Sequence, residues 1–211
     1  ATRPAQRSQS AITFSAIANC GVEDLAPHTV AFSDDYAAEF EDVFETGRTP
    51  RKPTVYIHAP DRPDAGGRAH DLRSSEGDHK NQGERMFLLV NAPANGGVGS
   101  YRPDEIDATR KAMHETLRRT GFDMTLDDNR TTVTTPDDFA RLFPSTGGAL
   151  YGRAPHGWQS SFQRMGSRTS IRGIYCAGGS VHPGPGVPMA TLSGRLAAEA
   201  VLMDIGYSSS D

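Results

Sequence analysis

The residues of this chain that could do chemistry are concentrated in its last third. Residues 173–188 have the sequence GIYCAGGSVHPGPGVP, a short apolar segment followed by a loop rich in glycine and proline, and a helical pattern begins at Met189. This order of strand, glycine-rich loop and helix suits an anionic or electron-rich ligand, because free amides at a helix N-terminus donate hydrogen bonds and glycine lets a ligand approach the backbone. An ordinary structural turn explains the pattern equally well, so both interpretations stay open.

The side chains around this loop form no familiar catalytic motif. Ser180 does not lie in a GxSxG motif, so a serine nucleophile has no support. His182 is a candidate general base, although a single histidine in such a loop more often bonds to backbone. Residues 145–158 (STGGALYGRAPHGW) contain His156 and Trp158, which could flank a substrate or anchor a packed loop. The catalytic acid or base is therefore unknown from the sequence.

No metal site or phosphate loop is predicted in the rest of the chain. His70 and His79 lie in the polar segment 61–85, but their spacing matches no ligand pattern. Residues 96–99 (GGVG) are followed by no Lys-Ser or Lys-Thr pair and complete no GxGxxG motif, so they predict a turn.

Composition excludes several classes of protein. The 211 residues include 22 basic and 26 acidic side chains, a net charge of −4, which argues against nucleic-acid binding. The longest strongly apolar run, residues 86–90, is far shorter than the roughly 20 residues that span a bilayer. No segment has the charged, apolar and small-residue order of a signal peptide. We therefore expect a soluble or surface-bound chain.

The elements that must position the loop follow from periodicity and from turn residues. Helical spacing and capping residues predict helices that end at Gly47, Gly121 and Pro144, and a longer one that begins at Met189. The predicted strands are residues 11–17, 29–32, 54–58 and 86–90, with a short buried strand at 173–177. Strands and helices alternate without a compositional break, which favours an α/β or α+β fold with a mixed sheet.

Residues 173–201 (GIYCAGGSVHPGPGVPMATLSGRLAAEAV) resemble the C-terminal flavin-binding signature of the FAD-dependent carotenoid desaturases, the phytoene desaturase group of the amine-oxidase-like flavoproteins. HPGPGVP followed by SGRLAAE is the most specific part. Residues 145–158 and 35–61, with DYAAEF and FETGRTPRKPTVYIHAPDR, are more similar to one branch, the bacterial hydroxycarotenoid 3,4-desaturases or methoxyneurosporene dehydrogenases. The resemblance covers most of residues 8–205 and is weakest across 64–85.

The resemblance implies an FAD-dependent oxidoreductase of carotenoid biosynthesis. Such enzymes dehydrogenate a C–C bond of a polyene: the flavin takes a hydride equivalent, a proton leaves, and a quinone or oxygen reoxidises the flavin. Their Rossmann-like FAD domain is built from both ends of the chain. We accordingly expect residues 1–172 to belong to the substrate-binding domain, with its mixed sheet and helices, and residues 173–211 to be the last strand, loop and helix of the FAD domain.

The resemblance also implies which residues contact the cofactor. Val187 and Met189 would offer backbone amides to the pyrimidine edge of the flavin, where reduction develops negative charge. Many relatives in the wider amine-oxidase group carry an acidic residue at the position of Gly179, so the ribityl contact departs from their pattern. The implied cofactor-binding residues are Gly178, Gly179, Ser180, Gly186, Val187 and Met189. The expected substrate contacts are Tyr151, His156, Trp158, Phe162 and His182.

One part of the family pattern is missing. The GxGxxG fingerprint that holds the ADP part of FAD lies near the N-terminus of these enzymes, and no such motif occurs in the 211 residues. We therefore expect the chain to correspond to the C-terminal portion, a fragment, of a desaturase. Alone it should be inactive and bind FAD weakly or not at all.

Other functions stay open at this stage. A phytoene-type desaturase or a carotene isomerase of the same family would carry the same motifs, and a truncated, non-catalytic binding module is an alternative of a different class. The family implies a carotenoid substrate and a cytoplasmic protein with peripheral attachment to a membrane surface, although no clear amphipathic membrane helix occurs in the sequence.

Overall fold

The computed structural model describes residues 7–63, 83–97, 101–154 and 164–206. The chain divides into two compact units, residues 9–148 and a second made of residues 1–8 and 149–211. We name them the sheet unit and the loop–helix unit and describe each by itself. The assignment of residues 1–172 and 173–211 to two functional domains stays a prediction.

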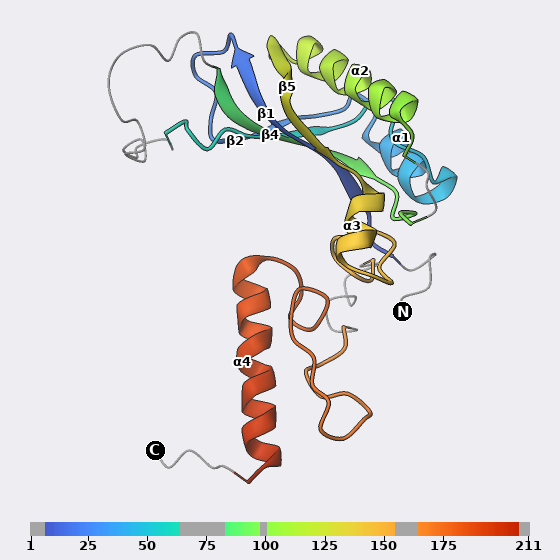
Figure 1. The fold of residues 1–211 in the computed structure, drawn as a ribbon, viewed down its shortest axis with the longest axis vertical. Helices are drawn as coiled ribbons and strands as arrows, with labels where there is room; N and C mark the ends of the chain where they lie inside the picture. The colour runs from blue at the N-terminus through green and yellow to red at the C-terminus, as the bar shows by residue number, and fades with distance from the viewer. Residues whose placement is uncertain (1–6, 64–82, 98–100, 155–163, 207–211) are drawn as a thin grey trace. The chain divides into compact units, whose positions relative to one another are not determined.

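A five-stranded antiparallel sheet, in the order β2–β3–β4–β1–β5, forms the sheet unit (Figure 1). The strands are β1 Ser10–Cys20, β2 His28–Ala31, β3 Val55–His58, β4 Glu84–Ala92 and β5 Met124–Thr134. All neighbouring strands among the described residues pair antiparallel, so the predicted mixed sheet is wrong. The reason is the position of β1. Strands β4 and β5 run in the same direction, but β1 lies between them and pairs with both.

The helices of the sheet unit end where the sequence predicts. Helix α1 (Tyr36–Phe40) continues as a π-helical segment, η2 (Glu41–Thr46), and Gly47 ends it in the left-handed conformation at φ 67°. Helix α2 (Pro103–Arg119) begins with a proline and ends before Gly121. Helix α3 is Pro136–Leu142, capped by the side chain of Thr135. The turn predicted at residues 96–99 is present as far as Gly97, whose amide donates to Asp137 at 2.7 Å.

The apolar core lies on the face of the sheet that α2 covers (Figure 1). Alternate residues of the strands meet Met113 and Leu117 of α2 there; the largest of them are Ile12, Phe14, Val55, Ile57, Leu88 and Val90. On the opposite face, Ala11 and Thr13 of β1 are buried, but most other side chains are partly buried or exposed and do not belong to this core. We call four large, partly buried side chains of this face the open face: Ile17, Tyr56, Phe87 and Leu89.

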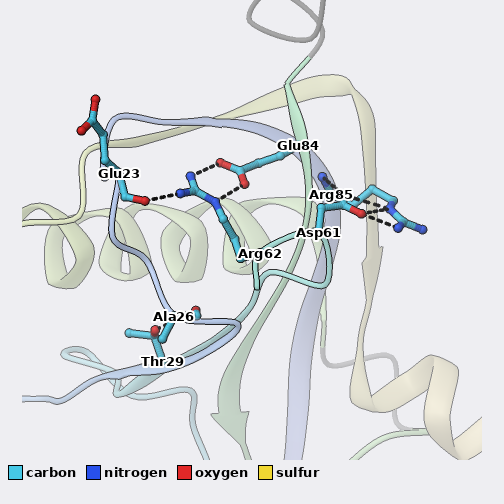
Figure 2. Close-up of polar contacts among 7 residues, drawn as sticks. All are labelled: Glu23, Ala26, Thr29, Asp61, Arg62, Glu84 and Arg85. Carbon is cyan, nitrogen blue, oxygen red and sulfur yellow. Dashed lines mark hydrogen bonds and ion pairs between the residues drawn. The ribbon is translucent and has the colours of Figure 1, made fainter. Parts of the chain in front are cut away.

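Two ion pairs fasten the beginning of β4 to the loop after β3 (Figure 2). Two nitrogens of Arg62 donate to the two carboxylate oxygens of Glu84, both at 2.7 Å, and a third donates to the carbonyl of Glu23 at 2.6 Å. Arg85 pairs with Asp61 beside them. Because the side chains of Arg62 and Glu84 are only 17% and 21% exposed, water screens this pair less than an ordinary surface ion pair.

The loop–helix unit contains helix α4 (Val187–Asp204) and a narrow hairpin before it. The buried strand predicted at 173–177 is wrong: Tyr175 forms a single β-bridge with Arg168, and Ile174 is 50% exposed. The chain turns back on itself here, and the amide of Ile174 donates to the carbonyl of Ile171. Within the described ranges, the segment therefore pairs only with the few residues just before the turn and is not covered by a sheet. No helix among the described residues is both long and apolar enough to cross a bilayer.

Candidate functional site

The N-terminus of α4 presents two free backbone donors. Gly186 caps the helix at φ 103° and its carbonyl accepts from the amide of Ala190 at 2.8 Å; only glycine adopts this φ without strain. Pro188 has no amide to donate. Among the described residues, the amides of Val187 and Met189 meet no acceptor, and their side chains are 82% and 40% exposed. The positive end of an 18-residue helix is thus available for an electron-rich group.

A buried serine joins α4 to the beginning of the glycine-rich loop. The hydroxyl oxygen of Ser193 accepts from the amide of Gly178 at 2.7 Å and lies 2.7 Å from the carbonyl of Ala190, to which it donates. Its side chain is completely buried. From the sequence, Ser193 is only a small residue on a helix, because the partner amide lies 15 residues earlier and no local motif connects the two.

Arg164, which the sequence did not single out, also holds the glycine-rich loop through hydrogen bonds to backbone. One guanidinium nitrogen of Arg164 donates to the carbonyls of Tyr151 and Gly179, at 3.1 and 3.3 Å. Its side chain also lies against Gly184, since a β-carbon there would be 3.4 Å from Arg164 Nε. This brings a fixed positive charge to the backbone around Gly179. No spacing in the sequence distinguishes Arg164 from the other arginines.

Several of the predicted residues lie close together through backbone contacts. The amide of Tyr151 donates to the hydroxyl of Ser8 at 3.0 Å, and the amide of Ser8 donates to the carbonyl of Gly152 at 2.9 Å. A β-carbon on Gly152 would be only 2.7 Å from the hydroxyl oxygen of Ser180. Tyr151, Gly179 and Ser180 are therefore brought together at one side of the loop.

His182 is held through its backbone: its amide donates to the carbonyl of Met165 at 2.9 Å, and its peptide bond to Pro183 is cis. These contacts describe the path of the loop and assign no proton transfer to the imidazole. The other predicted substrate contacts, His156, Trp158 and Phe162, lie outside the described residues and stay predictions. His70 and His79 also lie outside the described residues. In the described part of the chain, no three ligand-type side chains gather in a way that would hold a metal ion.

The far end of α4 is tied to the hairpin by a polar cluster. Asp204 accepts from Arg168 at 2.9 Å and from the Tyr175 hydroxyl at 2.6 Å. The Arg168 guanidinium, and then the Tyr175 hydroxyl, hold the pKa of Asp204 below its usual range. Arg168 also donates to the carbonyl of Ala200 at 3.2 Å, a favourable position for a cation near a helix C-terminus. Helix α4 is thus held near both ends.

Several proteins of known name are similar to this chain in sequence. No model of a protein family matches the chain. A hydroxyneurosporene desaturase of Rubrivivax gelatinosus is 44% identical over 209 residues, 99% of this chain. A protein of the same name from Cereibacter sphaeroides is 37% identical over 96% of the chain, and a 1-hydroxycarotenoid 3,4-desaturase of a Flavobacterium species is 29% identical over 93%. The chain spans about 38% of the length of each of these relatives.

Proposed function

We propose that this chain, which is related in sequence to the carotenoid desaturases, is the C-terminal part of an FAD-dependent enzyme that removes two hydrogens from a C–C bond of a hydroxycarotenoid. The observation that carries the proposal is the 44% identity to a hydroxyneurosporene desaturase across 99% of the chain. The resemblance of residues 173–201 to a flavin-binding signature agrees with it.

The N-terminus of α4 supports a place for the flavin. The free amides of Val187 and Met189 are suited to donate to the pyrimidine edge, and their hydrogen bonds strengthen when negative charge develops there. A β-carbon on Gly186 would meet nothing within 4 Å, so the backbone is open to a planar group. When bound, FAD accepts the hydride equivalent. This chain's own residues supply the donors and the orientation.

The glycine-rich loop supports a second contact, to the ribityl and diphosphate part of FAD. Gly178 and Gly179 carry no side chain, although the amide of Gly178 already donates to Ser193. Ser180 is an exposed residue that adds a hydroxyl. Arg164, which donates to the carbonyl of Gly179, adds positive charge beside this segment and so favours a diphosphate there.

The open face of the sheet unit supports a role in holding the polyene. Tyr56 and Leu89 are directly opposite each other on β3 and β4, and Phe87 is two residues from Leu89 on the same face. These partly exposed apolar side chains lie on one face of the sheet, where a conjugated chain can pack against them. Since carotenoids dissolve in lipid, we further propose peripheral attachment to the cytoplasmic face of a membrane, with a quinone or oxygen as the final acceptor.

A chimera tests the proposal. This chain replaces the matching 209-residue segment of the Rubrivivax gelatinosus protein, in cells that accumulate a 1-hydroxycarotenoid. We expect a product that is lighter than the substrate by two hydrogens. A chimera that folds and retains flavin but leaves the mass of the carotenoid unchanged would contradict the proposal.

A further inference from the structure

A small pocket lies beside α1 in the sheet unit, and the proposed flavin contacts make no use of it. It is a shallow recess whose empty space of about 170 Å³ includes open solvent at its mouth, so only a small group fits inside. Its lining residues are Gln9, Glu39, Phe40, Val43, Phe44 and Asn91. We propose that this pocket binds the hydroxyl end of a linear isoprenoid alcohol. The inference rests on the proposed function and identifies which end of the substrate the sheet unit recognises.

A buried carboxylate forms one side of the pocket. Glu39 is 2% exposed; its Oε1 accepts from the side-chain amide of Asn91 at 2.9 Å and its Oε2 accepts from the amide of Thr54 at 3.0 Å. A carboxylate oxygen can accept two hydrogen bonds, and each oxygen has one donor among the described residues. The carboxylate therefore has acceptor capacity left for a donor that enters the pocket.

The mouth of the pocket is aromatic. The rings of Phe40 and Phe44 are stacked with their centres 5.7 Å apart, and Tyr36 meets Phe40 edge-on at 4.8 Å. All three are exposed, by 53% for Tyr36, 37% for Phe40 and 41% for Phe44. Such a row of exposed rings is uncommon on a surface with no partner, and it suits a hydrocarbon chain that leaves the pocket.

The open face begins two residues along β4 from Asn91 of the pocket lining. Asn91, Leu89 and Phe87 occupy alternate positions of β4, so they lie on one face of the sheet. Across from Asn91, at the adjoining end of β1, lies Ala11, two residues after Gln9 of the pocket lining. A ligand whose polar end meets Glu39 can therefore extend over Leu89 and Phe87 without leaving the sheet unit.

The chemistry of the lining favours a hydrogen-bond donor over an anion or a plain hydrocarbon. Phosphates and carboxylates would be repelled by Glu39, and a hydrocarbon would leave the remaining acceptor capacity unused. A hydroxyl donates one hydrogen bond and carries no charge that the apolar walls would have to desolvate. The names of the relatives, hydroxyneurosporene desaturase and 1-hydroxycarotenoid 3,4-desaturase, describe substrates of this form.

Ligand-observed NMR on the 211-residue chain tests the inference with three probes of one skeleton. They are the tertiary alcohol 2,6-dimethyloct-7-en-2-ol, the hydrocarbon without the hydroxyl, and the amine in which an NH₂ group replaces the hydroxyl. We expect the alcohol to bind at least about tenfold more tightly than the hydrocarbon. Glu39→Gln should remove most of that difference, and Phe44→Ala should weaken both probes. Phe143→Ala, an exposed aromatic that does not line the pocket, is the matched control and should change neither.

Several results would overturn the inference. These are no binding of the alcohol, equal binding of alcohol and hydrocarbon, or tighter binding of the amine, which would indicate a cation site. If Glu39→Gln fails to fold, Phe44→Ala decides: unchanged affinity there also counts against the pocket. The chimera separates this inference from the proposed function, because a chimera that dehydrogenates hydroxylated and unhydroxylated carotenoids equally well retains the function and excludes the pocket.

Discussion

The backbone amide of Gly178 donates a hydrogen bond to the hydroxyl oxygen of Ser193 at 2.7 Å, joining the beginning of the glycine-rich loop to the second turn of α4. Ser193 is completely buried, so water cannot replace it. This contact relates the loop that we propose for the diphosphate part of FAD to the helix whose amides we propose for its pyrimidine edge.

Ser193→Ala should loosen that connection. The amide of Gly178 would lose its acceptor in a buried position, which costs about 1–3 kcal/mol. Hydrogen exchange at Gly178 and in α4 should become faster, as measured by mass spectrometry. Ser170→Ala, at an exposed serine of the same unit, is the control and should leave exchange unchanged. Equal protection in wild type and Ser193→Ala would show that this contact does not hold the loop.

Gly186→Val should abolish flavin retention in the chimera, because a β-branched residue is strained at φ 103° and the cap of α4 must change. Gly194→Ala is the matched control. It lies inside α4, a β-carbon there would meet nothing within 4 Å, and alanine favours a helix by about 1 kcal/mol. Flavin content is read from the absorbance of purified protein. A normal flavin content in Gly186→Val would remove α4 from the cofactor site.

The chain alone should bind FAD weakly or not at all, since its 211 residues contain no GxGxxG motif for the ADP part. An absorbance titration measures this directly. Stoichiometric uptake of flavin with micromolar or tighter affinity would show that the loop and α4 suffice.

Asp42→Asn should destabilise the sheet unit. Burial alone would raise the pKa of Asp42, but hydrogen bonds from Arg48 and Arg51 outweigh it and hold that pKa below its ordinary value. The carboxylate therefore adds stability above about pH 4, and this is lost as the pH falls through the folded-state pKa. At neutral pH we expect a loss of about 1–2 kcal/mol, because both arginines are half exposed or more. Urea unfolding at pH 7 and pH 3.5 measures it; a variant as stable as wild type at pH 7 would contradict this.

His114 should make the sheet unit sensitive to mild acid. Burial, and then the charge of Arg110, lower the pKa of His114, although Asp128 opposes them. The unfolded chain therefore binds the proton more readily, so stability is full above about pH 6.5 and decreases below it. His114→Gln should flatten the dependence of the melting temperature between about pH 7 and 5. Parallel pH profiles for the two proteins would exclude His114 as the cause.

Local signals predicted much of the sheet unit. Pro103 and Gly121 mark α2 because proline and glycine have fixed roles at helix ends, and the apolar strand at residues 86–90 lies within β4. Strand β5 was not predicted. It lies at the edge of the sheet, and its residues 127–132 are all polar, so the alternation that normally indicates a strand is missing.

Contacts between distant segments could not be predicted in the same way. Arg164 and Ser193 position the loop through single hydrogen bonds to backbone, which leave no pattern in the sequence. Glu39 has the spacing of an ordinary polar helix residue, yet it is buried, because Thr54 and Asn91 supply its donors from other elements. The loop was recognised from its residue types, whereas what holds it in place depends on the fold.

The most direct test of the account follows the flavin and the carotenoid together. The purified chimera, loaded with FAD, is mixed with a 1-hydroxycarotenoid in liposomes without oxygen or quinone, and absorbance spectra are recorded over time. We expect the flavin band to disappear while the polyene band moves to longer wavelength, one equivalent of each, and we expect neither change in the Gly186→Val chimera. A polyene shift without loss of the flavin band, or an unchanged polyene in a flavin-loaded chimera, would contradict this expectation.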